Sequence, residues 1–265
     1  MALLTKLNRP TILPGLPSQS LLISRGAAAA PGIPIDAALA VTLGAVTLSS
    51  AALAPAYPVL VTSGASTTNG TSVATASVTP DSDKVIFACV GASGAVQSTP
   101  TCSGNGLTWV QVSVADADAF RRLTVFRALG TASAGAITFD FGVLSQNSFA
   151  WNVVQFSGAD ATGTNGSGAV VQAVVEEDQA PATSNTITLA ALGSANNVNL
   201  TYVLHRIGGS AHIVPDADFV ELSETTTTAD TISIQCEWAR NQTDCTPTFG
   251  SDVHALIGIE VKTAV

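Results

Sequence analysis

The sequence carries little charge, because only 11% of its 265 residues are Asp, Glu, Lys or Arg. This is well under half of the roughly 25% that is usual in soluble globular domains. Neutral Ser, Thr, Asn and Gly must therefore cover most of the surface. Such short side chains lose little conformational freedom when they pack, which suits a protein that packs against neighbours or stays inert in the medium. The low charge does not choose between these two.

Basic residues are scarcer than acidic ones, at 10 against 19. Residues 1–60 hold three basic residues and one acid, a formal charge of +2, which leaves −11 for residues 61–265. Nucleic-acid binding depends on Lys and Arg side chains that neutralise phosphates and release counterions. We therefore expect no nucleic acid as a main partner.

Long hydrophobic runs are also scarce, and residues 37–56 form the one candidate for a membrane span or a signal-peptide core. Ala, Thr, Ser and Gly dominate this run, which makes it a poor membrane helix. Asp36 stands directly before it, where a signal peptide would carry basic residues. We expect no insertion into a membrane.

The sequence has no motif with the spacing that a catalytic or metal site requires. Asp252 and His254 could point to one side of a strand, but no Gly-x-Ser-x-Gly nucleophile motif accompanies them. Paired aspartates occur three times without the rest of a calcium loop, and such pairs commonly initiate turns. We expect no enzyme, catalytic residue, cofactor or metal. The pairs are Asp81 with Asp83, Asp116 with Asp118, and Asp216 with Asp218.

Four cysteines form two local pairs, Cys89 with Cys102 and Cys236 with Cys245. Cys89 and Cys236 lie in apolar runs where a free thiol packs as a small hydrophobic side chain. The sequence favours free cysteines and leaves a Cys236–Cys245 disulfide as the better of the two possible bridges. The spacings do not match a structural zinc site.

Residues 1–60 are predicted to form an extended anchoring arm. Prolines and glycines interrupt residues 1–34 so often that a continuous helix is excluded. Farther on, the sequence Ala-Val-Thr-Leu occurs twice around Gly44, a pattern typical of short strands. An extended strip has no core of its own, so we expect another protein surface to order it. The expected partner-binding residues are Val41, Leu43, Val46 and Leu48.

Residues 61–265 read as many short strands separated by polar turns, which predicts a β-sandwich or jelly roll. Residues 84–91 are apolar throughout, as expected of a central strand between packed layers. Residues 198–206 and 231–238 alternate, so one dry and one wet face is predicted for each. The predicted strands span residues 72–78, 84–91, 107–113, 122–128, 136–140, 148–156, 170–175, 186–189, 198–205, 219–222, 231–238 and 254–261.

The strand order, together with the segments Gly106-Leu107-Thr108-Trp109, Phe126-Arg127-Ala128, 151–158 and 257–261, resembles jelly-roll-like β-domains of tailed-bacteriophage virion proteins and related bacterial surface proteins. The resemblance implies a non-enzymatic virion component, such as a capsid decoration or cement protein, a head spike or fibre, or a minor tail protein. It implies capsid or tail subunits as partners, a homo-oligomer, and a location in the virion.

A carbohydrate-binding or receptor-binding module of a phage fibre or bacterial surface protein is the alternative. Sugar-binding sandwiches use exposed aromatic residues as stacking platforms. Trp109, Trp151 and Trp238 each lie in a predicted strand, where core packing is the expected role. Among them, Trp238 has the most polar neighbours and is the best candidate for a platform.

Overall fold

The computed structural model describes residues 56–206, 212–227 and 232–264, and these residues confirm the predicted all-β sandwich. The strands are β1 (Tyr57–Ser66), β2 (Ser72–Ala74), β3 (Val85–Gly94), β4 (Thr101–Gly104), β5 (Val110–Asp118), β6 (Arg121–Ala128), β7 (Ile137–Asp140), β8 (Gln146–Ser157), β9 (Val170–Ser184), β10 (Ile187–Thr188), β11 (Val198–His205), β12 (Val220–Thr226), β13 (Ser233–Arg240), β14 (Asp244–Cys245) and β15 (Thr248–Val261). A short 3-10 helix, η1 (Thr164–Ala169), precedes β9.

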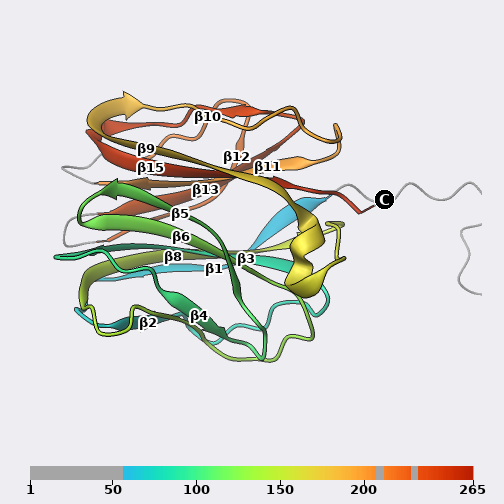
Figure 1. Cartoon of the computed structure of the whole chain (residues 1–265), viewed down its shortest axis with the longest axis horizontal. Coiled ribbons are helices and arrows are strands. Elements are labelled where there is room, and N and C mark those ends of the chain that lie inside the picture. Colours follow the sequence, from blue (N-terminus) through green and yellow to red (C-terminus); the bar gives the residue numbers. More distant parts are fainter. Residues whose placement is uncertain (1–55, 207–211, 228–231, 265) are drawn as a thin grey trace, which may run out of the picture. The chain divides into compact units, whose positions relative to one another are not determined.

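Two five-stranded antiparallel sheets face each other (Figure 1). The first has the strand order β1-β8-β3-β6-β5, and the second has the order β12-β13-β11-β15-β9. A small sheet, β2-β7-β4, covers the outer face of the first, while β10 and β14 pair over the outer face of the second. The strands therefore stack in four layers.

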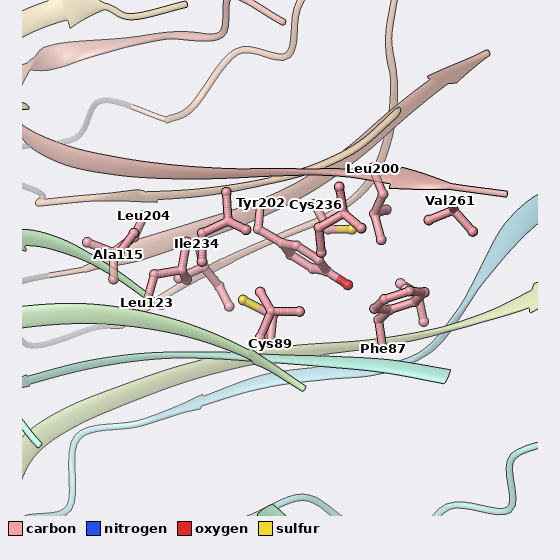
Figure 2. Close-up of a cluster of buried hydrophobic side chains, with 14 of the residues drawn as sticks. Phe87, Cys89, Ala115, Leu123, Leu200, Tyr202, Leu204, Ile234, Cys236 and Val261 are labelled. Atoms are coloured by element: carbon pink, nitrogen blue, oxygen red, sulfur yellow. The ribbon is translucent and has the colours of Figure 1, made fainter. Parts of the chain in front are cut away.

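The main hydrophobic core fills the space between the two large sheets (Figure 2). From β3, Phe87 and Cys89 point into this core, whereas Ile86, Ala88 and Val90 pack under the small sheet on the other side. Every residue of β3 is buried. The expectation of a central strand between packed layers is thus confirmed for 84–91, apart from Lys84, which is half-buried.

The two halves of the described chain have the same topology. If β1, β3, β5, β6 and β8 are matched to β9, β11, β12, β13 and β15, the two large sheets have identical strand orders. The small sheets match as well, because β2 pairs with β7 as β10 pairs with β14. At the sandwich edges β5 lies beside β9 and β1 lies beside β12. The two halves are thus related by an approximate two-fold arrangement.

The wet faces predicted for two strands are wrong. On β11 the alternate face is buried, including Asn199, Thr201 and His205, and on β13 the same holds for Ser233, Gln235 and Glu237. β10, β14 and the neighbouring loops cover this face, and the polar groups bond to those segments. Gln235, for instance, donates from Nε2 to the carbonyl oxygen of Ile213 at 3.0 Å.

Candidate interaction edge

β1 is the first described strand and forms one edge of the first large sheet. Within the described residues it is hydrogen-bonded to β8 alone. Its sequence, Tyr-Pro-Val-Leu-Val-Thr-Ser-Gly-Ala-Ser, contains no charged residue. Three of its apolar side chains reach solvent: Tyr57 is 45%, Val59 43% and Leu60 36% exposed. A long, uncharged, apolar edge is a template for pairing with another strand.

The other three edges of the large sheets all carry acidic side chains, which discourage pairing between chains. These residues are Asp116 and Asp118 on β5, Glu176 and Glu177 on β9, and Glu221 and Glu224 on β12. β9 is the strand that corresponds to β1 in the other half, and it is tied to its neighbour: Glu177 Oε1 accepts a hydrogen bond from the backbone N–H of Asp116 at 2.7 Å. Among the four edges, β1 is therefore the uncharged one.

The chain enters the sandwich at a fixed point. Ala56 is fully buried in the main core, and its carbonyl oxygen accepts a hydrogen bond from Nη2 of Arg240 at 2.9 Å. Pro58 is also buried, and its lack of an N–H is tolerated on an edge strand. The body therefore begins before residue 60, and the predicted domain boundary at 60 falls inside β1.

The loops at the opposite end of the first sheet are tied together. Nε2 of Gln97 donates to the carbonyl oxygens of Asp118 and Arg121, next to the β5–β6 turn. Gln146, itself buried, donates to the carbonyl oxygen of Val96 at 3.2 Å. On this scaffold Val96, Phe120 and Val143 are exposed. Three separate loops thus present apolar side chains from a braced end.

A buried carboxylate, Glu237, lies on the outer face of the second sheet. It accepts hydrogen bonds from the backbone N–H of Asp216 at 2.9 Å and from the thiol of Cys245 at 3.4 Å. Burial, with the nearby charges of Asp216 and Glu221, raises the pKa of Glu237 to about 7. Through these hydrogen bonds, and the one that Asp216 accepts from the N–H of Thr246, the two carboxylates hold the 216–219 loop and β14 against the sheet.

Two histidines from neighbouring strands, His205 and His254, enclose the ring of Phe249. The ring centroids are 4.9 Å apart for His205 and 4.6 Å for His254. His205 bonds through Nε2 to the carbonyl oxygen of Gly250, and burial lowers its pKa. His254 bonds to the backbone oxygen of Asp252, so the two residues do not form the side-chain pair that a catalytic triad requires.

The paired aspartates serve local structure. Asp116 and Asp118 form ion pairs with Arg122 and Arg121, at 2.6 and 2.5 Å. Asp216 closes its own turn by accepting the N–H of Asp218. In the described part of the chain no three His, Cys, Asp or Glu side chains gather as a metal site would need.

The expected partner-binding residues Val41, Leu43, Val46 and Leu48 lie outside the described residues. The two cysteines of the possible disulfide are described, and both thiols are free. Cys236 points into the main core beside Tyr202, whereas Cys245 belongs to the cluster on the opposite face of the sheet. The structure therefore does not bring Cys236 and Cys245 together.

The tryptophans pack against the clusters. Trp151 is buried across Gly64 of β1, and Trp109 and Trp238 are half-buried.

Sequence reasoning missed β1 as an interaction site because the boundary at residue 60 divided it. The uninterrupted run of apolar and β-forming residues from 57 to 62 is the signal that could have found it.

No family model, curated protein or solved structure matches this chain. None of the helices in the described residues is long and apolar enough to span a membrane.

Proposed function

We propose that this chain is a non-enzymatic structural component of a bacteriophage particle. Residues 1–55 dock on capsid or tail subunits, and the sandwich seals a junction or is displayed at the surface. The role is that of a capsid decoration, cement or minor tail protein.

The observation that carries the proposal is the polarity of the sandwich. The arm joins at Ala56, and the register places Tyr57 opposite Ser157 at the same end of β1. Ala159 follows the end of β8 at Ser157 and forms an isolated β-bridge with Thr263. The segment after β15 therefore lies at the same end of the sandwich as Tyr57. The braced loops with Phe120 lie at the other end of the sheet. This arrangement supports a role in which one end of the body attaches and the other is displayed.

The low charge and the packing of the body support the same proposal. Short neutral side chains on the surface suit close packing against subunits. Buried polar groups are used for fastening loops to the sheets, as Glu237 and Asp216 illustrate. Trp109 and Trp238 are half-buried and pack against the hydrophobic clusters, which supports a role in core packing.

The test is incorporation of a truncated chain into particles. Deletion of residues 1–55 keeps Ala56 and its bond to Arg240, so the body is expected to stay folded by circular dichroism. Particles assembled with the truncated chain are expected to lack it in quantitative mass spectrometry. Incorporation at the level of the full chain would refute the proposal.

A further inference from the structure

Among the described residues, β1 has a strand of its own sheet on one side alone, so its other edge offers backbone groups to a further strand. Because β1 pairs with β8 on one side, alternate N–H and C=O groups on its other side point away from the sheet. β12 lies near β1 but belongs to the opposite sheet. The edge is broken once, because the register shifts between Leu60 and Thr62 and leaves Val61 as an extra residue.

One segment of this same chain fits that edge. Residues 40–48 consist of two four-residue stretches of β-forming and small residues on either side of Gly44. β1 likewise has two regular stretches on either side of Val61. Glycine inside a strand often marks a bulge, and Gly44 would stand opposite the bulge of β1 at Val61. Neither the segment nor β1 carries a charge.

Charge favours the arm of one copy meeting the body of another. Residues 1–60 have a formal charge of +2 and residues 61–265 one of −11. Two acidic bodies repel each other, whereas the arm of one copy is attracted to the body of the next. The uncharged β1 is the edge at which the approach meets no acidic side chain of the strand itself.

Residues 49–56, which connect the segment to β1, do not have the composition of a two-residue hairpin turn. Ala56 is held in the core by Arg240, which fixes the direction of the chain there. Residues 49–56, Ser-Ser-Ala-Ala-Leu-Ala-Pro-Ala, contain no Gly, Asn or Asp. Those residues supply the backbone conformations of tight reversals between strands.

We infer that β1 is the acceptor for residues 40–48 of a second copy of this chain, which add to the first sheet as a sixth strand. Backbone hydrogen bonds supply the affinity, and the exposed Tyr57, Val59 and Leu60 supply apolar contacts. This inference rests on the proposed docking role of the arm and adds a second copy of this chain as the partner of residues 40–48.

The decisive experiment is disulfide trapping between two full-length variants. One carries Val46→Cys, and the other carries a cysteine at Tyr57, Val59 or Leu60 in turn. Oxidation of the mixture is expected to give a covalent dimer on a non-reducing gel with at least one of the three. The control partner is Val171→Cys on the corresponding edge strand β9, where Val171 is 49% exposed, and it is expected to give none.

A double variant that carries both cysteines in one chain shows whether residues 40–48 pair with β1 of the same copy or of another copy. Pairing between copies gives covalent oligomers from that double variant, and pairing within one copy gives a cross-linked monomer. A cross-linked monomer alone, or no cross-link with any of the three positions, overturns the inference.

A charge placed on the edge gives an independent test. Val59→Lys is expected to weaken self-association of the full chain by roughly tenfold or more in sedimentation equilibrium. Val171→Lys, the matched control, is expected to leave it unchanged. If Val59→Lys has no effect while the chain lacking residues 1–55 still fails to join particles, the acceptor is wrong and the docking proposal stands. Normal incorporation of that truncated chain refutes the docking proposal itself.

Discussion

At the scale of single residues, Glu237 shows how this fold uses polar groups. The carboxylate is fully buried yet bonded to Asp216 and Cys245, and these bonds secure two covering segments to the second sheet. A protonated carboxyl group suits such a dry site better than a charged one. The residue therefore links the stability of the outer layer to pH.

Glu237→Gln is expected to remove a loss of stability at high pH. The pKa of Glu237 rises from 4.5 when unfolded to about 7 when folded. Its stabilising contribution is therefore complete below pH 4.5 and is lost as the pH rises through 7. Between pH 4.5 and pH 8 the free energy of unfolding of the variant should change by up to about 3 kcal/mol less than that of the parent. Urea unfolding at both pH values measures this difference.

Asp218→Asn serves as the control for that measurement, because Asp218 is exposed in the loop beside Asp216. It is expected to keep the pH dependence of the parent chain. An equal pH dependence in Glu237→Gln and in the parent would contradict the assignment.

At the scale of elements, the central strands β3 and β11 carry the packing. Both are buried along their whole length, because each large sheet is covered on both faces. At one point the two sheets come so close that only glycine fits: a Cβ on Gly91 would lie 2.7 Å from Cγ2 of Ile234 and 2.8 Å from Cδ1 of Leu204.

Gly91→Ala is expected to lower the free energy of unfolding by about 1–3 kcal/mol, since the added methyl group overpacks the core between the sheets. Gly135→Ala is the matched control, because its Cβ would meet nothing closer than 3.9 Å. Denaturant unfolding of both variants provides the comparison. Equal stability of Gly91→Ala and the parent would show that the sheets can separate locally at no cost.

Most strands could be predicted from the sequence because apolar and β-branched residues recur between polar turns. The outer layers could not. Asn199, Gln235 and Glu237 alternate with apolar residues in the same way as a solvated face, and only the fold shows that loops distant in sequence cover them. β1 was missed for another reason: the boundary placed at residue 60 divided its run of apolar residues.

At the scale of the whole molecule, the described chain is two equivalent halves that share one core. Residues 57–157 and 170–261 each build a large sheet with a small outer sheet. The inner faces of both large sheets form a single cluster that includes Phe87, Leu123, Tyr202 and Ile234 (Figure 2). Neither half can bury its inner face without the other, so the two are expected to unfold together.

A chain of residues 56–265 is expected to unfold in one cooperative transition. Trp109 and Trp151 report on the first half, and Trp238 reports on the second. Variants that retain fluorescence from one half only, Trp238→Phe and the double variant Trp109→Phe with Trp151→Phe, should then agree with circular dichroism in showing the two signals change together. Separate midpoints for the two halves within one variant would mean that they are independent domains.

The placement of β15 matters for how the protein is made. It lies between β9 and β11 in the second sheet, yet it follows all the other described strands in the sequence. The strands of the first sheet are all synthesised by Ser157, some ninety residues before β15 is begun at Thr248. During that interval the inner face of the first sheet has no finished partner, and exposed apolar surface of this kind promotes aggregation of nascent chains. The sandwich is therefore expected to close only once β15 has been added to the second sheet.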